Sequence, residues 1–233
     1  MEMDISFVVP FKKPLNNAKL VVFRNVHPYI PDEMTGEFLD SCQKYAKVYG
    51  VYLVTCLFAL RDYLCVAIVN REGAFESISK ASHLNLVTGK KFKRSGDIEV
   101  TQTPLGKIFA CVDTDIYYPE IARVAVLQGC DLIVSSQYID EVDFDKQMLS
   151  AGAFNISQQN CVHVAAASNI SASVYAPGEL TGDRSGIVLP VTTDFPAAAH
   201  IDTGLTYHSR EKLKVKLTQN NLLLKHYSLG NLE

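Results

Sequence analysis

Short apolar runs alternate with helical patterns along the chain, and this order occurs twice. The first half contains predicted strands at Ile5–Val9, Leu20–Phe23, Val51–Phe58, Tyr63–Val69 and near Ala74–Ser79, with a helix at Thr35–Tyr49. The second half contains predicted strands at Gly106–Val112, Asp131–Val134, Cys161–Ala167 and Gly186–Pro190, with helices from Pro119 to Gly129 and at Asp143–Asn160. Two related β-α-β-β halves with apolar sheets must cover both faces of each sheet. We therefore predict an α/β fold, a four-layer α-β-β-α sandwich, in which residues 1–233 form one domain.

The segment Glu120–Gln128 is apolar on nearly all sides of its predicted helix. Such a helix is buried on more than one side. Two interpretations account for this equally: a helix inside a large monomer, or a helix that pairs with its own copy across a two-fold axis. We carry the homodimer forward as the expectation.

Composition excludes several classes of protein. The chain has 233 residues, 48% of them apolar, and a formal charge of −3. A charge so close to zero does not predict a nucleic-acid partner. The N-terminal sequence MEMDISFVVPFKK is acidic at its start and unlike a signal peptide, and no apolar stretch approaches the ~18 residues of a membrane span. We expect a cytoplasmic protein with no membrane contact.

The six cysteines lie singly within apolar or helical patterns, at Cys42, Cys56, Cys65, Cys111, Cys130 and Cys161. None forms a CxxC pair, which predicts buried thiols of a reducing compartment and not disulfides or zinc ligands. The histidines show no ligand spacing either. We expect no metal and no cofactor.

The loop after one predicted strand carries an unusual set of acids. The stretch Ala110–Arg123 reads ACVDTDIYYPEIAR, so the apolar strand ends at Asp113 and Asp115 before the next helix begins. Loops at strand ends are where α/β enzymes hold their reacting groups. This loop offers two carboxylates and no nucleophile.

Several motifs together resemble the nitrilase (carbon–nitrogen hydrolase) superfamily along nearly the whole chain. They are TPLGK at Thr103–Lys107, the run from Asp113 through Pro119-Glu120 to Arg123, GCDLIVSSQ at Gly129–Gln137, VNREG at Val69–Gly73 followed by Lys80 and His83-Leu84, NCVHVAAASN at Asn160–Asn169 and GDRSGIVLP at Gly182–Pro190. The resemblance implies a hydrolase of amides or nitriles that uses a cysteine nucleophile, a lysine and a glutamate base.

Only part of that catalytic set is carried over by the resemblance. Lys80 takes the place of the family lysine, Asp113 takes the place of the cysteine, and Asn25 takes the place of the glutamate. The spacing from Lys80 to His83 is one residue longer than is common in the family, and the segment His83–Gly96 lacks the family's second glutamate. By the same resemblance, Asp115, Glu120 and Arg123 support the pocket.

These replacements predict a pseudoenzyme. Attack on an amide needs a polarizable thiolate, and an asparagine cannot accept a proton. We expect Lys80 and Asp113 to form an ion pair within ~4 Å, with Asn25 in hydrogen-bond range of one of them. The function is then binding or assembly. Two alternatives stay open. One is an active amidase with a non-standard site that uses Asp113, Lys80 or Cys111, although we expect Cys111 to be a buried, inert thiol and not a shifted nucleophile. The other is a protein that binds a small amide- or carboxylate-bearing ligand in the remnant pocket.

Overall fold

The computed structural model describes residues 1–15, 17–140 and 146–212, with residues 146–151 described by their backbone alone. Two β-sheets account for the strands of this part of the chain. The first has the strand order β13-β1-β2-β3-β5-β4, with β6 also paired to β5. Its strands are β1 (Glu2–Val8), β2 (Ala18–Phe23), β3 (Tyr52–Val54), β4 (Phe58–Leu60), β5 (Tyr63–Val69), β6 (Phe75–Lys80) and β13 (Ala197–Asp202).

The second sheet is built from the second half of the chain, in the order β12-β11-β10-β9-β8-β7. Its strands are β7 (Thr101–Thr103), β8 (Gly106–Val112), β9 (Leu132–Ser136), β10 (His163–Ala167), β11 (Ala172–Tyr175) and β12 (Ile187–Thr192). In both sheets the central strands are parallel: β1, β2 and β3 in the first, β8, β9 and β10 in the second.

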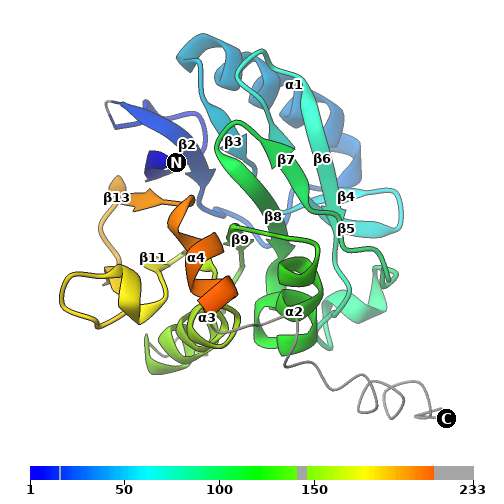
Figure 1. Ribbon diagram of the computed structural model, residues 1–233. Helices are drawn as coiled ribbons and strands as arrows, with labels where there is room; N and C mark the ends of the chain where they lie inside the picture. The colour runs from blue at the N-terminus through cyan, green and yellow to red at the C-terminus, as the bar shows by residue number, and fades with distance from the viewer. Residues whose placement is uncertain (16, 141–145, 213–233) are drawn as a thin grey trace, which may run out of the picture.

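The two sheets pack face to face, and helices cover their outer faces (Figure 1). Helix α1 (Asp32–Tyr49) packs on the first sheet, and α2 (Pro119–Leu127) and α3 (Lys146–Asn160) pack on the second. A fourth helix, α4 (Leu205–Lys212), follows β13. The predicted α-β-β-α sandwich is therefore confirmed.

Three apolar clusters correspond to the three interfaces between these layers. The cluster between the sheets includes Leu20, Ile68 and Val134, all fully buried. Every second residue of a strand points to the same face of the sheet, so a continuous apolar strand supplies residues to two clusters. The clusters beneath α1 and beneath α2 and α3 take the intervening residues.

One predicted strand is wrong in its extent. Val51–Phe58 was expected to be continuous, yet the chain forms β3 and β4 with a break between them. At the break the backbone of Leu57 turns away from β5: its N–H donates to the side chain of Asn25 and its carbonyl accepts from Ile30. A polar side chain from the neighbouring strand end thus replaces the sheet ladder.

Other elements differ from the predicted ones at their ends. The first three residues of the predicted helix Asp143–Asn160 lie outside the described residues, and α1 begins three residues earlier than Thr35. The strands β7, β11 and β13 and the helix α4 were not predicted. Strand β13 leaves the second half and pairs antiparallel with β1, close to the N-terminus (Figure 1).

All six cysteines are free and buried, as predicted. No helix in the described part of the chain is both long enough and apolar enough to cross a membrane.

Candidate functional site

A cleft opens at the carboxyl ends of the parallel strands, where ligands bind in many α/β folds. Its volume is about 1140 Å³. It is lined by Pro28, Tyr29, Pro31, Asp32, Glu33, Ala59, Arg61, Asn85, Leu86, Val87, Thr88, Lys91, Phe92, Asp113, Thr114, Tyr117, Tyr138, Ile139 and Asp140. Of the three predicted catalytic residues, Asp113 lines this cleft.

Asp113 follows the last residue of β8 and begins the 3₁₀ turn η2 (Asp113–Tyr117). Its φ of 48° lies in the left-handed region, which residues other than glycine adopt rarely and at a cost of about 1 kcal/mol or more. The side chain is 4% exposed, and one carboxylate oxygen accepts the backbone N–H of Tyr138 at 3.1 Å. The strained turn therefore directs a buried carboxylate to the base of the cleft.

The electrostatics of Asp113 are those of an acid without a counterion. Burial raises the pKa of its carboxyl to about 6, and the negative charge of Asp115 adds to this, while the N–H groups of Tyr138 and Thr114 oppose it. A carboxyl with this pKa changes its protonation state close to neutral pH.

Asn25 lies just beyond β2 and is fully buried. Its amide group donates to the hydroxyl of Ser136 at 2.9 Å and to the carbonyl of Gln137 at 2.8 Å, and its oxygen accepts the N–H of Leu57 at 2.7 Å. Both hydrogens of the amide are thus in use. The side chain joins the ends of the two sheets.

Asn25 and Asp113 hold opposite ends of the same peptide unit. The carbonyl of Gln137 accepts from Asn25, and the next N–H, that of Tyr138, donates to Asp113. The structure therefore brings these two residues to one place, as the sequence predicted. The hydrogen bonds of the two side chains meet at this backbone peptide, and no direct hydrogen bond is found between Asn25 and Asp113, both of which the structure describes.

The predicted ion pair between Lys80 and Asp113 is wrong. Lys80 is the last residue of β6 and pairs in register with Cys65 of β5, so it shares the face of the sheet that α1 covers. Its ammonium lies over the ring of Tyr63, 4.8 Å from the ring centroid. The next residue, Ala81, points into the core between the sheets. A shift of one residue along a strand moves a side chain to the opposite face, which explains the extra residue between Lys80 and His83.

The predicted supporting residues divide into two groups. Asp115 is buried and its carboxylate accepts the N–H groups of Ser82 and His83, at 3.0 and 2.7 Å, and contacts Nδ1 of His83 at 3.0 Å. Burial raises the pKa of Asp115, and these hydrogen bonds oppose the rise. Glu120 lies 3.5 Å from the other ring nitrogen of His83. These contacts tether the segment that continues into the cleft wall.

Arg123 does not reach the cleft. Its guanidinium donates to the carbonyl of Gln159 in α3 at 3.1 Å, so it joins two helices on the outer face of the second sheet. Its predicted place in the pocket is corrected accordingly.

Cys111 is buried, as expected for all six cysteines. It is 1% exposed and packs in the cluster between the second sheet and its helices. Burial, together with the charges of Asp115 and Asp113, raises the pKa of this thiol well above its ordinary value. A thiol that stays protonated is a poor nucleophile.

Sequence reasoning did not assign the aromatic walls of the cleft. Tyr29 and Phe92 meet edge to face with ring centroids 5.1 Å apart, and Tyr117 donates its hydroxyl to Oε1 of Gln137 at 3.0 Å. Tyr138 completes the lining beside Asp113. The polar run Ser-Ser-Gln, which ends β9 and continues to Gln137, was the available signal for the Gln137 contacts. Tyr29 and Phe92 belong to loops that no periodicity marks.

Within residues 1–15, 17–140 and 146–212, no three His, Cys, Asp or Glu side chains are grouped closely enough to hold a metal ion.

A strand-end cleft between two sheets of a four-layer sandwich defines a class of fold, and comparison with known proteins gives the family. The family model for carbon-nitrogen hydrolases matches residues 4–189. The chain belongs to this family.

The chain is also similar to individual proteins in sequence or in fold. A protein described as a probable nitrilase from Schizosaccharomyces pombe is 28% identical over 107 residues, which span 44% of this chain and 37% of that protein. The chain thus matches little more than a third of the length of this curated relative. Among solved structures, a carbon-nitrogen hydrolase from Helicobacter pylori has a TM-score of 0.79 at 16% identity and covers 98% of both chains. Nit3 from Saccharomyces cerevisiae, a member of branch 10 of the nitrilase superfamily, has a TM-score of 0.73 at 14% identity, covering 94% of this chain and 96% of its own.

Proposed function

We propose that this carbon–nitrogen hydrolase relative is a pseudoenzyme that binds a small ligand in the strand-end cleft and does not hydrolyse amides or nitriles. The observation that carries the proposal is the buried Asp113 at the end of β8, where the resemblance expects the cysteine nucleophile. A carboxylate attacks an amide poorly, because a mixed anhydride would have to form.

The family's general base is also replaced, by a residue that cannot accept a proton. Asn25 occupies the place expected for the glutamate, and both hydrogens of its amide are engaged with Ser136 and Gln137. It holds structure at the strand ends and has no site for a proton. The family lysine has no counterpart in the cleft either, since Lys80 lies on the face covered by α1.

No cysteine of the chain replaces the nucleophile. Burial raises the pKa of Cys56, Cys65 and Cys130 to about 12 and raises the pKa of Cys42, Cys111 and Cys161 as well. Loss of several members of one catalytic unit removes most of the rate enhancement. What remains is a cleft of a size that suits a small molecule.

One observation favours a second candidate, a hydrolase with a reworked site. A carboxyl with a pKa of about 6 in a cleft has the proton affinity of a general base that activates water at neutral pH. Asp113 would accept a proton from that water as it attacks the substrate.

The test is release of ammonia from simple amides and nitriles, such as acetamide and benzonitrile, by the unmodified protein. We expect no release above that of a boiled sample. Turnover that disappears in Asp113→Ala but persists in Lys80→Ala, with both variants folded, would overturn the proposal in favour of the reworked site.

We further propose that the protein is a homodimer that uses the outer face of α2. Most of the apolar residues of α2 are buried within their own chain, including Ile121, Ala125 and Val126. Val124 and Tyr118 remain 40% and 38% exposed and would form the centre of the contact. Sedimentation velocity at micromolar concentration tests this, and a monomer there would refute it.

A further inference from the structure

The base of the cleft carries a negative charge that no basic side chain neutralises. Among the ion pairs found within the described residues, none includes Asp113, although its carboxylate is 4% exposed. A carboxylate has about four acceptor positions. The backbone N–H groups of Tyr138 and Thr114 use part of this capacity.

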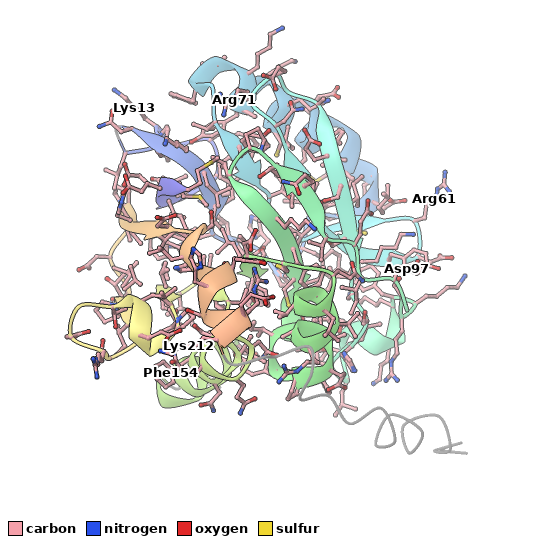
Figure 2. All side chains as sticks on the ribbon, in the orientation of Figure 1. Lys13, Arg61, Arg71, Asp97, Phe154 and Lys212 are labelled. Carbon is pink, nitrogen blue, oxygen red and sulfur yellow. The ribbon has the colours of Figure 1, made fainter. Side chains whose placement is uncertain are left out.

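The two basic residues of the cleft are both committed away from its base. The ammonium of Lys91 donates to the hydroxyl of Tyr29 at 2.9 Å. Arg61 lies in the turn between β4 and β5, and its side chain projects outward from the body of the protein (Figure 2). Three further acids, Asp32, Glu33 and Asp140, line the cleft. The cleft is therefore acidic at its base and its rim.

The walls of the cleft are aromatic. Tyr117 and Tyr138 stand beside Asp113, and Tyr29 with Phe92 form an edge-to-face pair farther along. Aromatic faces attract cations and also bury apolar surface. A carboxylate surrounded by rings is the combination that recognises an ammonium group attached to an apolar body.

We propose that the ligand of this cleft is an organic amine, whose ammonium group binds the carboxylate of Asp113 while its apolar part packs against the tyrosines; the inference rests on the proposed binding function. It reverses the expectation of an amide- or carboxylate-bearing ligand. A carboxylate ligand would be repelled by Asp113, and the amine supplies the cation that Asp113 lacks.

Probes that share a phenylethyl group and differ in the charge of the attached head group test this inference by isothermal titration calorimetry on the full chain. Phenethylammonium carries the positive charge, 2-phenylethanol and 3-phenylpropanamide are neutral, and 3-phenylpropionate is negative. At pH 7.5 we expect the ammonium probe to bind at least about tenfold more tightly than either neutral probe, because a hydrogen bond between two charged groups is stronger than one to a neutral group. We expect the propionate to bind most weakly.

Substitutions and a change of pH test whether the preference for the ammonium probe arises from Asp113. In Asp113→Asn the preference for the ammonium probe should vanish, whereas Asp140→Asn, at the rim, should change it less than about threefold, as a screened charge does. In the unmodified protein, affinity for the ammonium probe should fall about tenfold from pH 7.5 to pH 5, because Asp113, with a pKa of about 6, becomes protonated. The probe itself stays charged over this range.

The outcomes separate the two proposals. Equal binding of all probes, tighter binding of the propionate, no binding of any probe, or a preference that survives in Asp113→Asn each overturns the amine inference. Ammonia release from 3-phenylpropanamide in the same samples overturns the pseudoenzyme proposal instead, whatever the order of affinities.

Discussion

Asp113 should destabilise the folded protein at neutral pH, and removing its charge should stabilise it. The folded-state pKa of about 6 exceeds the ordinary aspartate value of 3.8, so the folded state holds a proton more tightly than the unfolded state. The stability that this provides is fully present below pH 3.8 and is lost as the pH rises through 6. At pH 7.5 the loss is about 3 kcal/mol, from about 2.2 pKa units at 1.36 kcal/mol each.

The variant Asp113→Asn isolates this contribution. Its oxygen can still accept the N–H of Tyr138, but the side chain is neutral at every pH. We expect the variant to gain about 2 kcal/mol relative to the unmodified protein between pH 4.5 and pH 7.5, which corresponds to about 1 M in the midpoint of urea unfolding.

Urea titrations of both proteins at the two pH values measure this gain. The change in unfolding free energy between pH 4.5 and pH 7.5 is determined for each protein, and the value for the unmodified protein is subtracted from that for the variant to give the difference. Other titrating groups cancel in it, including His163, whose pKa is lowered by burial to about 4 and which reduces stability as the pH falls below 6.5. The exposed acid Asp97 supplies a matched control, and Asp97→Asn should shift the difference by less than about 0.5 kcal/mol. A gain for Asp113→Asn that does not change with pH, or a loss at pH 7.5, would show that the carboxylate is stabilised by a partner and that our reasoning is wrong.

The remaining predictions concern neighbouring positions. Iodoacetamide should not label Cys111 in the native protein, because the thiol is buried and protonated; rapid, selective labelling detected by mass spectrometry at neutral pH would revive the shifted nucleophile. Asn25→Ala should lower the free energy of unfolding by about 3 kcal/mol, because three buried polar groups lose their hydrogen-bond partner: the hydroxyl of Ser136, the carbonyl of Gln137 and the N–H of Leu57. An unchanged urea midpoint would contradict this. Lys80→Ala should cost less than about 1 kcal/mol by the same assay, whereas Ala81→Lys should cost about 3 kcal/mol or more because it places a charge between the sheets. Similar costs for these two variants would show that the face assignment is wrong.

The layers of the fold could be predicted because their signals are local. Strands such as β5 and β8 are long apolar runs, and α1 repeats apolar residues at helical spacing and ends at Gly50, whose φ is 63°. Strand β13 was missed because its alanine-rich sequence is equally compatible with a helix, and its pairing with β1 joins residues almost 200 positions apart.

The site was predicted in part. The positions of Asn25 and Asp113 were implied by the family resemblance, and both residues lie where expected, just beyond the ends of β2 and β8. Lys80 was misplaced because the face to which a strand residue points depends on the register of the strand. The turn signals before β6 do not fix that register to within one residue. The partners of Asn25 could not be foreseen, since they come from β9 and from a break in the sheet at Leu57.

The peptide unit held between Asn25 and Asp113 couples these two positions, so that a substitution at one changes the surroundings of the other. A carboxylate at position 25 could accept a hydrogen bond from the hydroxyl of Ser136, but it would have no hydrogen to offer the carbonyl of Gln137, so a glutamate there would leave that carbonyl without its present donor. Rotation of that peptide would release the N–H of Tyr138 from Asp113 at the same time. Placing the family's glutamate and cysteine at positions 25 and 113 would therefore also require a new arrangement of the backbone at 137–138.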